Sequence, residues 1–526
     1  MRKLEIGIID LVSKGPVNTL WARIMHANLA SIMPQIVASW CESQGHKVTF
    51  TCYTGFEKLD RELSGKYDIV FICSFSQAAF LAYSISNYFR SKGAVTVLGG
   101  PHARCYPDDS TKYFDYVLGM TNKGMITDLL SSFSPQHPGV HISAKQQPSE
   151  FPSVEERWKY MEPTLKKAPF VKFIPMMASV GCPYTCSFCI DATVPYQQLS
   201  AEALKADLKF LLTKFKKPMV AWQDPNFGIR FNDTMEAIAS VGGEGRFQFL
   251  AESSLSILTK EHLTMMKKHH FRALLPGIES WYDMGNKSNA AHVGAQEKVN
   301  RVSEHVNMVL DYVPYIQTNF VLGLDCDSGE EPFELTKQFI DKSPGAFPGY
   351  SLLTSFGEAA PLNLEYQREG RVLPLPFHFL NNHLGMNLKP KNYEWIDFYE
   401  KVIDVTEYTF SSKAIYNRFK ATSNGTSRWM NVMRAISNEG FGRIRFYKTI
   451  LKNLREDSSF RAYFEGETKQ LPAFYKNIIE KDLGVWLRWL PEGAIDHDPN
   501  AYLKKTKTGP EKVKAGKAVI NTISGS

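Results

Sequence analysis

The chain has 526 residues, enough for about three domains of ~150 residues each, and 44% of them are apolar. Its net charge is +7, but six lysines lie in the segment 504–517, so the charge gives little support for a nucleic-acid partner. Eight cysteines in this length do not make a disulfide framework, and no apolar stretch approaches the ~20 residues of a membrane-spanning helix. Glu5 and Asp10 lie inside the first apolar run, which argues against a secretory signal. We therefore expect a cytoplasmic protein without a membrane partner.

The first 140 residues alternate between strand-like and helix-like patterns. Residues 4–11 and 47–55 are strand-like, and the runs 68–74 and 94–99 look buried on both faces. This pattern is typical of a parallel sheet with helices on both sides, so we predict a Rossmann-like domain over residues 1–140. Ligands of such sheets bind at the carboxyl ends of the strands. The candidate binding residues at these ends are Asp10, Ser74, Ser76, Gly99, Gly100 and His102.

A loop with three cysteines follows the short apolar stretch 173–180. Cys182, Cys186 and Cys189 have C-x3-C-x2-C spacing, and no other Cys or His lies within twenty residues on either side. A structural zinc ion or a complete iron–sulfur cluster normally takes four protein ligands. A metal bound here therefore keeps one coordination position open, and a cluster with an open iron can hold a small molecule and pass it an electron. The alternatives are a zinc site with a distant fourth ligand and three buried structural thiols.

The spacing of these cysteines, with Phe188 directly before the last one, resembles the cluster loop of the radical S-adenosylmethionine (SAM) superfamily. The resemblance implies that the three cysteines hold a 4Fe-4S cluster and that the amino and carboxylate groups of SAM chelate its fourth iron. It also implies that an electron from the reduced cluster breaks a carbon–sulfur bond of SAM. The products are methionine and a 5′-deoxyadenosyl radical that abstracts a hydrogen atom. An electron donor such as flavodoxin or ferredoxin is the expected partner.

The strand-end loops of the first domain resemble the cobalamin-binding domain that precedes the radical SAM core in one large subclass. The familiar cobalamin fingerprint is D-x-H-x-x-G; Asp10 and Gly15 match it, whereas Val12 occupies the histidine position and cannot ligate cobalt. The subclass commonly lacks this histidine. Gly99-Gly100 would let the nucleotide tail of cobalamin approach the backbone closely. A ligand-free relic domain is the alternative, and His102 fits an ordinary loop histidine as well as a cofactor contact.

Strand and helix patterns alternate about six times from residue 171 onward. We predict a radical SAM core over residues 165–360, folded as the partial (β/α)6 barrel of the TIM type that the resemblance implies. Barrel enzymes place their chemistry at the carboxyl ends of the strands. The strand candidates are 173–180, 218–223, 247–253, 273–277, 315–323 and 350–354.

Carboxylates stand at consecutive strand ends of this predicted barrel. They suit hydrogen bonds from an ammonium group or from ribose hydroxyls, and the resemblance places SAM at these ends. The sequence Gly242-Gly243-Glu244 looks like a family motif for the SAM amino group, but it follows a helix, so we predict a plain turn on the opposite face. The predicted SAM contacts are Phe188, Asp224, Glu252, Glu279 and Ser280.

The last third of the chain has a mostly helical pattern over residues 387–503. Apolar residues recur at three- and four-residue intervals in 393–410, 424–438 and 443–453. We expect this C-terminal extension to close the open side of the barrel and to shape the substrate pocket. Residues 504–526 are rich in Lys, Gly and Thr and are predicted to form a basic flexible tail.

The leading functional hypothesis is a cobalamin-dependent radical SAM enzyme that methylates an unactivated carbon of a small molecule or natural product. Its expected cofactors are a 4Fe-4S cluster, SAM and cobalamin. One alternative is a radical SAM isomerase, cyclase or dehydrogenase with a relic first domain. Another is a nonenzymatic iron–sulfur electron carrier. Nucleic-acid modification is a further alternative, but the chain has no second cysteine cluster and no evident basic RNA-binding module.

Overall fold

The computed structural model describes residues 2–17, 30–148, 150–168, 172–242, 244–282, 294–381 and 383–499. The predicted tail 504–526 and Gly243 of the predicted turn lie outside the described residues. Within the described ranges, no helix has both the length and the hydrophobicity needed to cross a membrane.

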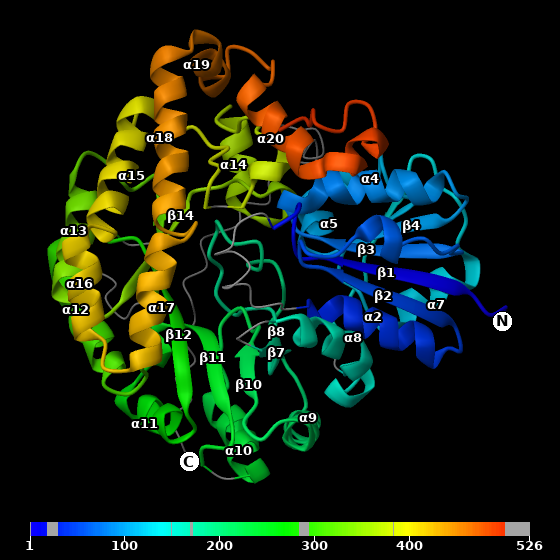
Figure 1. Cartoon of the computed structure of the whole chain (residues 1–526), viewed down its shortest axis with the longest axis horizontal. Helices are drawn as coiled ribbons and strands as arrows, with labels where there is room; N and C mark the ends of the chain where they lie inside the picture. Colours follow the sequence, from blue (N-terminus) through cyan, green and yellow to red (C-terminus); the bar gives the residue numbers. More distant parts are fainter. Residues whose placement is uncertain are drawn as a thin grey trace.

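The first sheet has six parallel strands in the order β2-β1-β3-β4-β5-β6 (Figure 1). This arrangement confirms the predicted Rossmann-like domain. The first four strands lie within one or two residues of the predicted ranges, whereas β5 and β6 were not predicted. The strands are β1 (Glu5–Leu11), β2 (Lys47–Tyr53), β3 (Ile69–Ser74), β4 (Val95–Gly99), β5 (Tyr116–Leu118) and β6 (Val140–Ile142).

Helices cover both faces of this sheet because successive strand residues point to opposite sides. Ile8 belongs to a buried cluster with residues of α2 (Ile32–Ser43), α7 (Lys123–Ser132) and α8 (Val154–Lys167). Its neighbour Ile9 belongs to a second cluster, with residues of α4 (Ala79–Arg90). The short helices of this region are α3 (Leu59–Glu62), α5 (Pro101–Cys105) and α6 (Pro107–Ser110).

The second sheet also has six parallel strands, in the order β14-β13-β12-β11-β10-β7, so spatial order follows chain order. A helix follows each of the first five strands, which is the (β/α) repeat that we predicted. The strands are β7 (Phe173–Met176), β10 (Met219–Trp222), β11 (Gln248–Ser254), β12 (Phe271–Glu279), β13 (Gln317–Leu322) and β14 (Phe347–Leu352). The helices are α9 (Ala201–Lys214), α10 (Phe231–Gly242), α11 (Lys260–Lys268), α12 (Ala295–Leu310) and α13 (Glu331–Lys342).

The predicted strand 173–180 is two separate elements. β7 ends at Met176, and β8 (Ser179–Val180) pairs antiparallel with β9 (Gln197–Gln198). The chain leaves the sheet here because the Ala178 N–H donates to the carboxylate of Asp224. The resulting small hairpin encloses the loop that carries the three cysteines.

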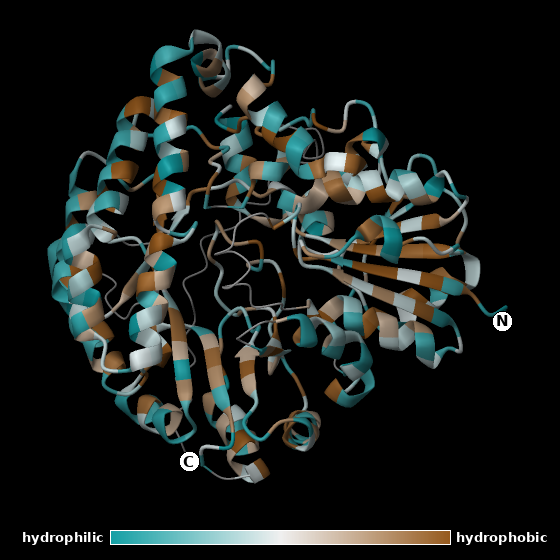
Figure 2. Ribbon diagram, in the orientation of Figure 1, coloured by the Kyte–Doolittle hydropathy of each residue, from teal (hydrophilic) through white to brown (hydrophobic). Residues whose placement is uncertain are grey.

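The C-terminal part is helical, as predicted, and covers the edge strand β14. Phe347 of β14 packs in a buried cluster with Phe410, Ala435 and Ile444. The extension also reaches the first domain, where the Asn87 side chain donates to the Trp489 carbonyl at 2.9 Å (Figure 1). Hydrophobic residues concentrate along the strands of both sheets (Figure 2). The helices are α14 (Leu362–Arg368), α15 (Trp395–Thr409), α16 (Ser412–Ala421), α17 (Gly425–Ile436), α18 (Phe441–Glu456), α19 (Ser458–Glu465) and α20 (Ala473–Leu483).

Phe249 tests the core of the second sheet. Its side chain is fully buried on β11 and packs against Trp222 and Phe271, with ring centroids 5.8 and 5.0 Å away. We expect Phe249→Ala to lower the free energy of unfolding by about 3–5 kcal/mol, because the cavity adds to the lost transfer energy. In urea unfolding, the control Tyr416→Ala, whose residue is 63% exposed, should change this energy by less than about 0.5 kcal/mol. Equal effects of the two variants would contradict this assignment of the core.

Candidate active site

A cavity with a volume of about 620 Å³ lies where the carboxyl ends of the two sheets meet. Ser76 and Pro101 form part of its wall on the side of the first domain, and Ser351 and Thr354 form part of the opposite wall. The cavity therefore brings residues of both predicted domains together. The predicted site residues that line it are Ser76, Cys182, Cys186, Phe188, Cys189, Glu252 and Glu279.

The three-cysteine loop has a defined local structure. It starts at Gly181, whose φ of +72° favours glycine and where an added Cβ would lie 2.3 Å from the Pro195 carbonyl oxygen. The loop then turns tightly, because the Cys189 N–H donates to the Cys186 carbonyl at 2.9 Å. The Asp191 N–H donates to Cys189 Sγ at 3.4 Å. This last contact is the kind of hydrogen bond that stabilises a thiolate ligand.

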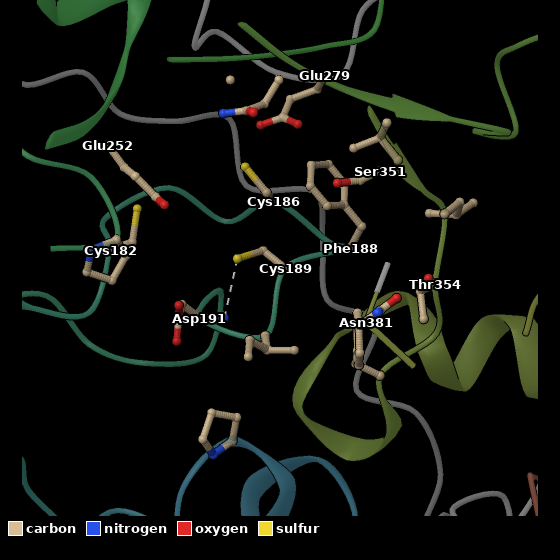
Figure 3. A pocket seen from close by; sticks show the side chains of 18 of the residues that line it. Cys182, Cys186, Phe188, Cys189, Asp191, Glu252, Glu279, Ser351, Thr354 and Asn381 are labelled. Atoms are coloured by element: carbon tan, nitrogen blue, oxygen red, sulfur yellow. Dashed lines mark hydrogen bonds between the residues drawn. The ribbon is translucent and has the colours of Figure 1, made fainter. Parts of the chain in front are cut away.

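The three thiols face a shared space in the cavity (Figure 3). In the described part of the chain, no three His, Cys, Asp or Glu side chains lie close enough together to hold one metal ion. Three thiols of one loop that line one cavity match the donor set of a 4Fe-4S cluster whose fourth iron has no protein ligand.

Asp224 contacts the residues just before the three-cysteine loop and does not belong to the cavity lining. Its carboxylate accepts hydrogen bonds from the Ala178 N–H at 3.1 Å and from Ser179 Oγ at 2.6 Å. Burial raises its pKa to about 6, against the hydrogen bonds from Ser179 and Ala178 that favour the charged form. Asp224 was predicted to contact SAM, but the structure instead places its oxygens at the base of the β8–β9 hairpin. Its neighbour Asn226 lines the cavity.

Two carboxylates reach the cavity from adjacent strands, as predicted. Glu252 comes from β11, and Glu279 comes from the end of β12. Glu279 has a φ of +64°, and the pairing of β12 with β13 shifts register between Gly277 and Glu279. Such a bulge re-aims a side chain, and non-glycine residues with positive φ gather at functional sites. Gly277 gives room for this turn, because an added Cβ would lie 2.2 Å from Glu279 Oε1.

Ser280, the next predicted SAM contact, points elsewhere. It lies 4% exposed outside the cavity lining, its Oγ accepts from the Tyr282 N–H at 3.1 Å, and it lies 3.6 Å from Cys326 Sγ. Ser280 lies beyond the end of β12 and after the positive-φ turn at Glu279, so its side chain does not follow the direction of the strand.

The predicted cobalamin residues lie at the carboxyl ends of β1, β3 and β4, but of these only Ser76 lines the cavity in the described structure. Asp10 is fully buried, and its Oδ1 has no hydrogen-bond partner among the described residues. Its Oδ2 accepts from the Ser31 N–H at 2.6 Å, and burial raises its pKa to about 6. Gly99 has open space where a side chain would stand. An orphaned acceptor and open backbone at these strand ends fit a ligand with amide donors, such as cobalamin.

His102 belongs to the interior of the first domain. It is fully buried, with Nε2 2.7 Å from the Tyr83 hydroxyl and Nδ1 3.3 Å from Ser76 Oγ. Burial lowers its pKa to about 3. Both nitrogens are occupied by protein groups, which agrees with the alternative of an ordinary histidine. Ser74 is also turned inward, since its Oγ donates to the Phe75 carbonyl.

The far end of the cavity was not predicted from the sequence. Its polar lining there includes Asn319, Ser351, Asn381 and His383. Burial and the nearby Arg443 lower the pKa of His383, so its imidazole is neutral near pH 7. His383 and Asn381 come from a loop after α14 that has no motif or periodicity, so no local pattern pointed to them.

Two curated methyltransferases from Chlorobaculum tepidum are similar to this chain. Bacteriochlorophyllide d C-8(2)-methyltransferase is 26% identical over 390 residues, which cover 69% of this chain and 83% of that protein. Bacteriochlorophyllide d C-12(1)-methyltransferase is 24% identical over 337 residues, which cover 61% and 70%. No protein-family model matches the chain.

Two solved structures share the fold. The radical SAM methyltransferase TsrM from Kitasatospora setae, with cobalamin and a [4Fe-4S] cluster bound, has a TM-score of 0.51 and 12% identity, and the match covers 87% of this chain and 100% of TsrM. The cobalamin-dependent SAM radical enzyme OxsB, with aqua-cobalamin and SAM bound, has a TM-score of 0.54 and 12% identity, covering 97% and 82%. The chain therefore shares the fold of these two enzymes, and the two curated proteins to which it is similar are methyltransferases.

Asp224 makes the stability of the protein depend on pH in a defined window. Its pKa is about 6 in the folded chain against an ordinary value of 3.8, so the folded state binds the proton more tightly. Its contribution to stability is therefore greatest below pH 4 and falls as pH rises to 6. In urea unfolding, we compare the free energy of unfolding of Asp224→Asn with that of the wild type. The variant's value minus the wild-type value should rise between pH 4 and 7 by an amount on the order of 3 kcal/mol. A difference that stays constant over this range would contradict the assignment.

Proposed function

We propose that this chain is a radical SAM enzyme that cleaves SAM at a 4Fe-4S cluster and transfers a methyl group to an unactivated carbon with the help of cobalamin. One observation carries the proposal. A single cavity is lined by all three cysteines, by two strand-end carboxylates and by residues that follow β3 and β4 of the first domain. The cluster site, the SAM site and the cobalamin domain thus open onto the same space, as a methyl transfer between them requires.

The charge of the cavity supports SAM as the ligand beside the cluster. In the described lining, every charged side chain is a carboxylate, namely Asp191, Glu252 and Glu279. SAM carries a sulfonium and an ammonium cation, and carboxylates bind both its ammonium group and its ribose hydroxyls. Glu252 and Glu279 therefore orient SAM, while Phe188 packs beside Cys186 and excludes water from the cluster (Figure 3).

Cys182, Cys186 and Cys189 would hold the cluster, and the ends of β1, β3 and β4 would hold cobalamin. When bound, the cluster supplies the electron that splits SAM, and cobalamin supplies the methyl group. Val12 lies at the place where a cobalt-ligating histidine would stand, so the chain offers no imidazole there. A flavodoxin or ferredoxin in the cytoplasm is the proposed electron source.

The substrate is a small molecule that occupies the far end of the cavity. Its lining of amide, hydroxyl and neutral imidazole groups can orient a ligand by hydrogen bonds. The two curated relatives are named for bacteriochlorophyllide d, and TsrM has been solved with tryptophan as substrate. We therefore propose a ring-containing substrate, methylated at a carbon that lacks an activating group.

The cluster is tested by Cys186→Ala under anaerobic conditions. We expect reconstituted wild type to bind iron and sulfide and to release 5′-deoxyadenosine from SAM when reduced. The variant should lose both properties, because two thiolates do not hold a 4Fe-4S cluster with one open iron. Cys41→Ala is the matched control, since Cys41 is a buried thiol on α2 in the first domain. Iron binding without any 5′-deoxyadenosine in the wild type would refute the radical SAM proposal.

Cobalamin binding is tested separately by visible spectra after reconstitution and desalting. We expect the wild type to retain cobalamin and Gly100→Ala to retain less, because the new Cβ would lie 2.8 Å from Cys73 Sγ and 3.0 Å from Ser74 N at the end of β3. Gly93→Ala is the control, since Gly93 also has positive φ but meets nothing within 4 Å. A wild type that releases 5′-deoxyadenosine but retains no cobalamin would be the radical SAM isomerase, cyclase or dehydrogenase instead.

A further inference from the structure

Arg104 joins the first domain to the three-cysteine loop. It lies on α5, directly after β4, and its guanidinium makes two contacts with consecutive residues of the loop. One terminal nitrogen donates to Asp191 Oδ1 at 3.2 Å, and the other donates to the Ile190 carbonyl at 2.6 Å. The side chains of Arg104 and Asp191 are 26% and 28% exposed, so this pair is partly shielded from water.

The residue held by Arg104 also touches a cluster ligand. The Asp191 N–H donates to Cys189 Sγ at 3.4 Å (Figure 3). A two-point contact of a planar guanidinium fixes geometry better than a single charge does. Arg104 therefore holds the peptide that carries this N–H, and it adds a positive charge close to the cysteine thiols.

The backbone around Arg104 is itself held in place by contacts with other parts of the protein. The Tyr106 hydroxyl, just after α5, donates to the Ser355 carbonyl at 3.1 Å. The Cys105 carbonyl packs against Gly357, where an added Cβ would lie only 1.9 Å away. Because α5 is fastened to the segment after β14, Arg104 positions the loop relative to both sheets.

We propose that Arg104 is a positioning residue that fixes the cluster loop and raises the reduction potential of the cluster bound there. The inference rests on the proposed function, because it assumes that a cluster occupies the three cysteines. Reduction adds a negative charge, which a nearby guanidinium stabilises and a nearby carboxylate opposes. The hydrogen bond from Asp191 N–H to the thiolate acts in the same direction as the guanidinium. Loss of Arg104 therefore removes a charge and loosens this hydrogen bond.

The test is an anaerobic redox titration of the reconstituted chain, followed by electron paramagnetic resonance, which needs no substrate. We expect Arg104→Gln to shift the reduction potential of the cluster in the negative direction by about 59 mV. This shift corresponds to a tenfold change in the equilibrium constant of a one-electron reduction. Asp191→Asn keeps an oxygen acceptor for Arg104 but removes the negative charge, so it should shift the potential in the positive direction. Arg104→Lys keeps the charge and should restore most of the wild-type potential.

Arg90→Gln is the matched control. Arg90 also contacts one carboxylate, Asp115, and one carbonyl, that of Gln136, and its side chain is 27% exposed, but both contacts stay within the first domain. Its loss should leave the potential unchanged.

The proposal is overturned if Arg104→Gln titrates like Arg90→Gln, or if Arg104→Gln and Asp191→Asn shift the potential in the same direction. The titration reads the cluster-bound fraction, so partial loss of iron does not hide the result, and the Lys and Asn variants test the idea if Arg104→Gln fails to fold. A wild type without an iron–sulfur signal refutes this inference together with the proposed function. A wild type with a cluster but without SAM cleavage refutes only the proposed function.

Discussion

The site depends on a buried carboxylate. An ionised Asp224 inside the protein would cost several kcal/mol without partners. Here the Ala178 N–H and the Ser179 hydroxyl compensate part of that cost, while burial still raises its pKa to about 6. The same hydrogen bonds draw the chain away from the sheet after β7 and start the β8–β9 hairpin. The position of the three cysteines is therefore set by an interaction between Asp224, just after β10, and the base of the loop.

The loop is then held from two further directions. Arg104 binds its far end from the first domain, and the Leu362 N–H at the start of α14 donates to the Ser187 carbonyl at 3.0 Å. Three parts of the chain that are distant in sequence thus fix one loop of about ten residues. Because loops with few such contacts are mobile, this anchoring keeps the thiols in one arrangement beside Glu252 and Glu279.

The sequence allowed most of the architecture to be predicted, because long strands carry a clear pattern. β5 and β6 have three residues each, too few for any periodicity to be read, and they were not predicted. Asp224, Glu252 and Glu279 all lie near the carboxyl ends of strands, but the sequence does not reveal that the Asp224 carboxylate binds the Ala178 N–H and the Ser179 hydroxyl. The burial of the His102 side chain could not be predicted either, since its partners Tyr83 and Ser76 lie 19 and 26 residues away in the sequence. Such placements depend on packing between elements.

The same limit applies to the far end of the cavity, where the C-terminal helices act. His383 Nδ1 lies 3.1 Å from the Tyr350 carbonyl, and Arg443 of α18 donates to that same carbonyl at 2.9 Å. The Tyr447 hydroxyl, one turn along α18, donates to the His383 carbonyl. The Tyr350 carbonyl, which can only accept a hydrogen bond, therefore fixes the tautomer of His383 with the proton on Nδ1, and burial beside Arg443 keeps the ring neutral. With the proton on Nδ1, the other ring nitrogen is an acceptor, and the contacts of α18 with Tyr350 and His383 position this residue of the cavity lining.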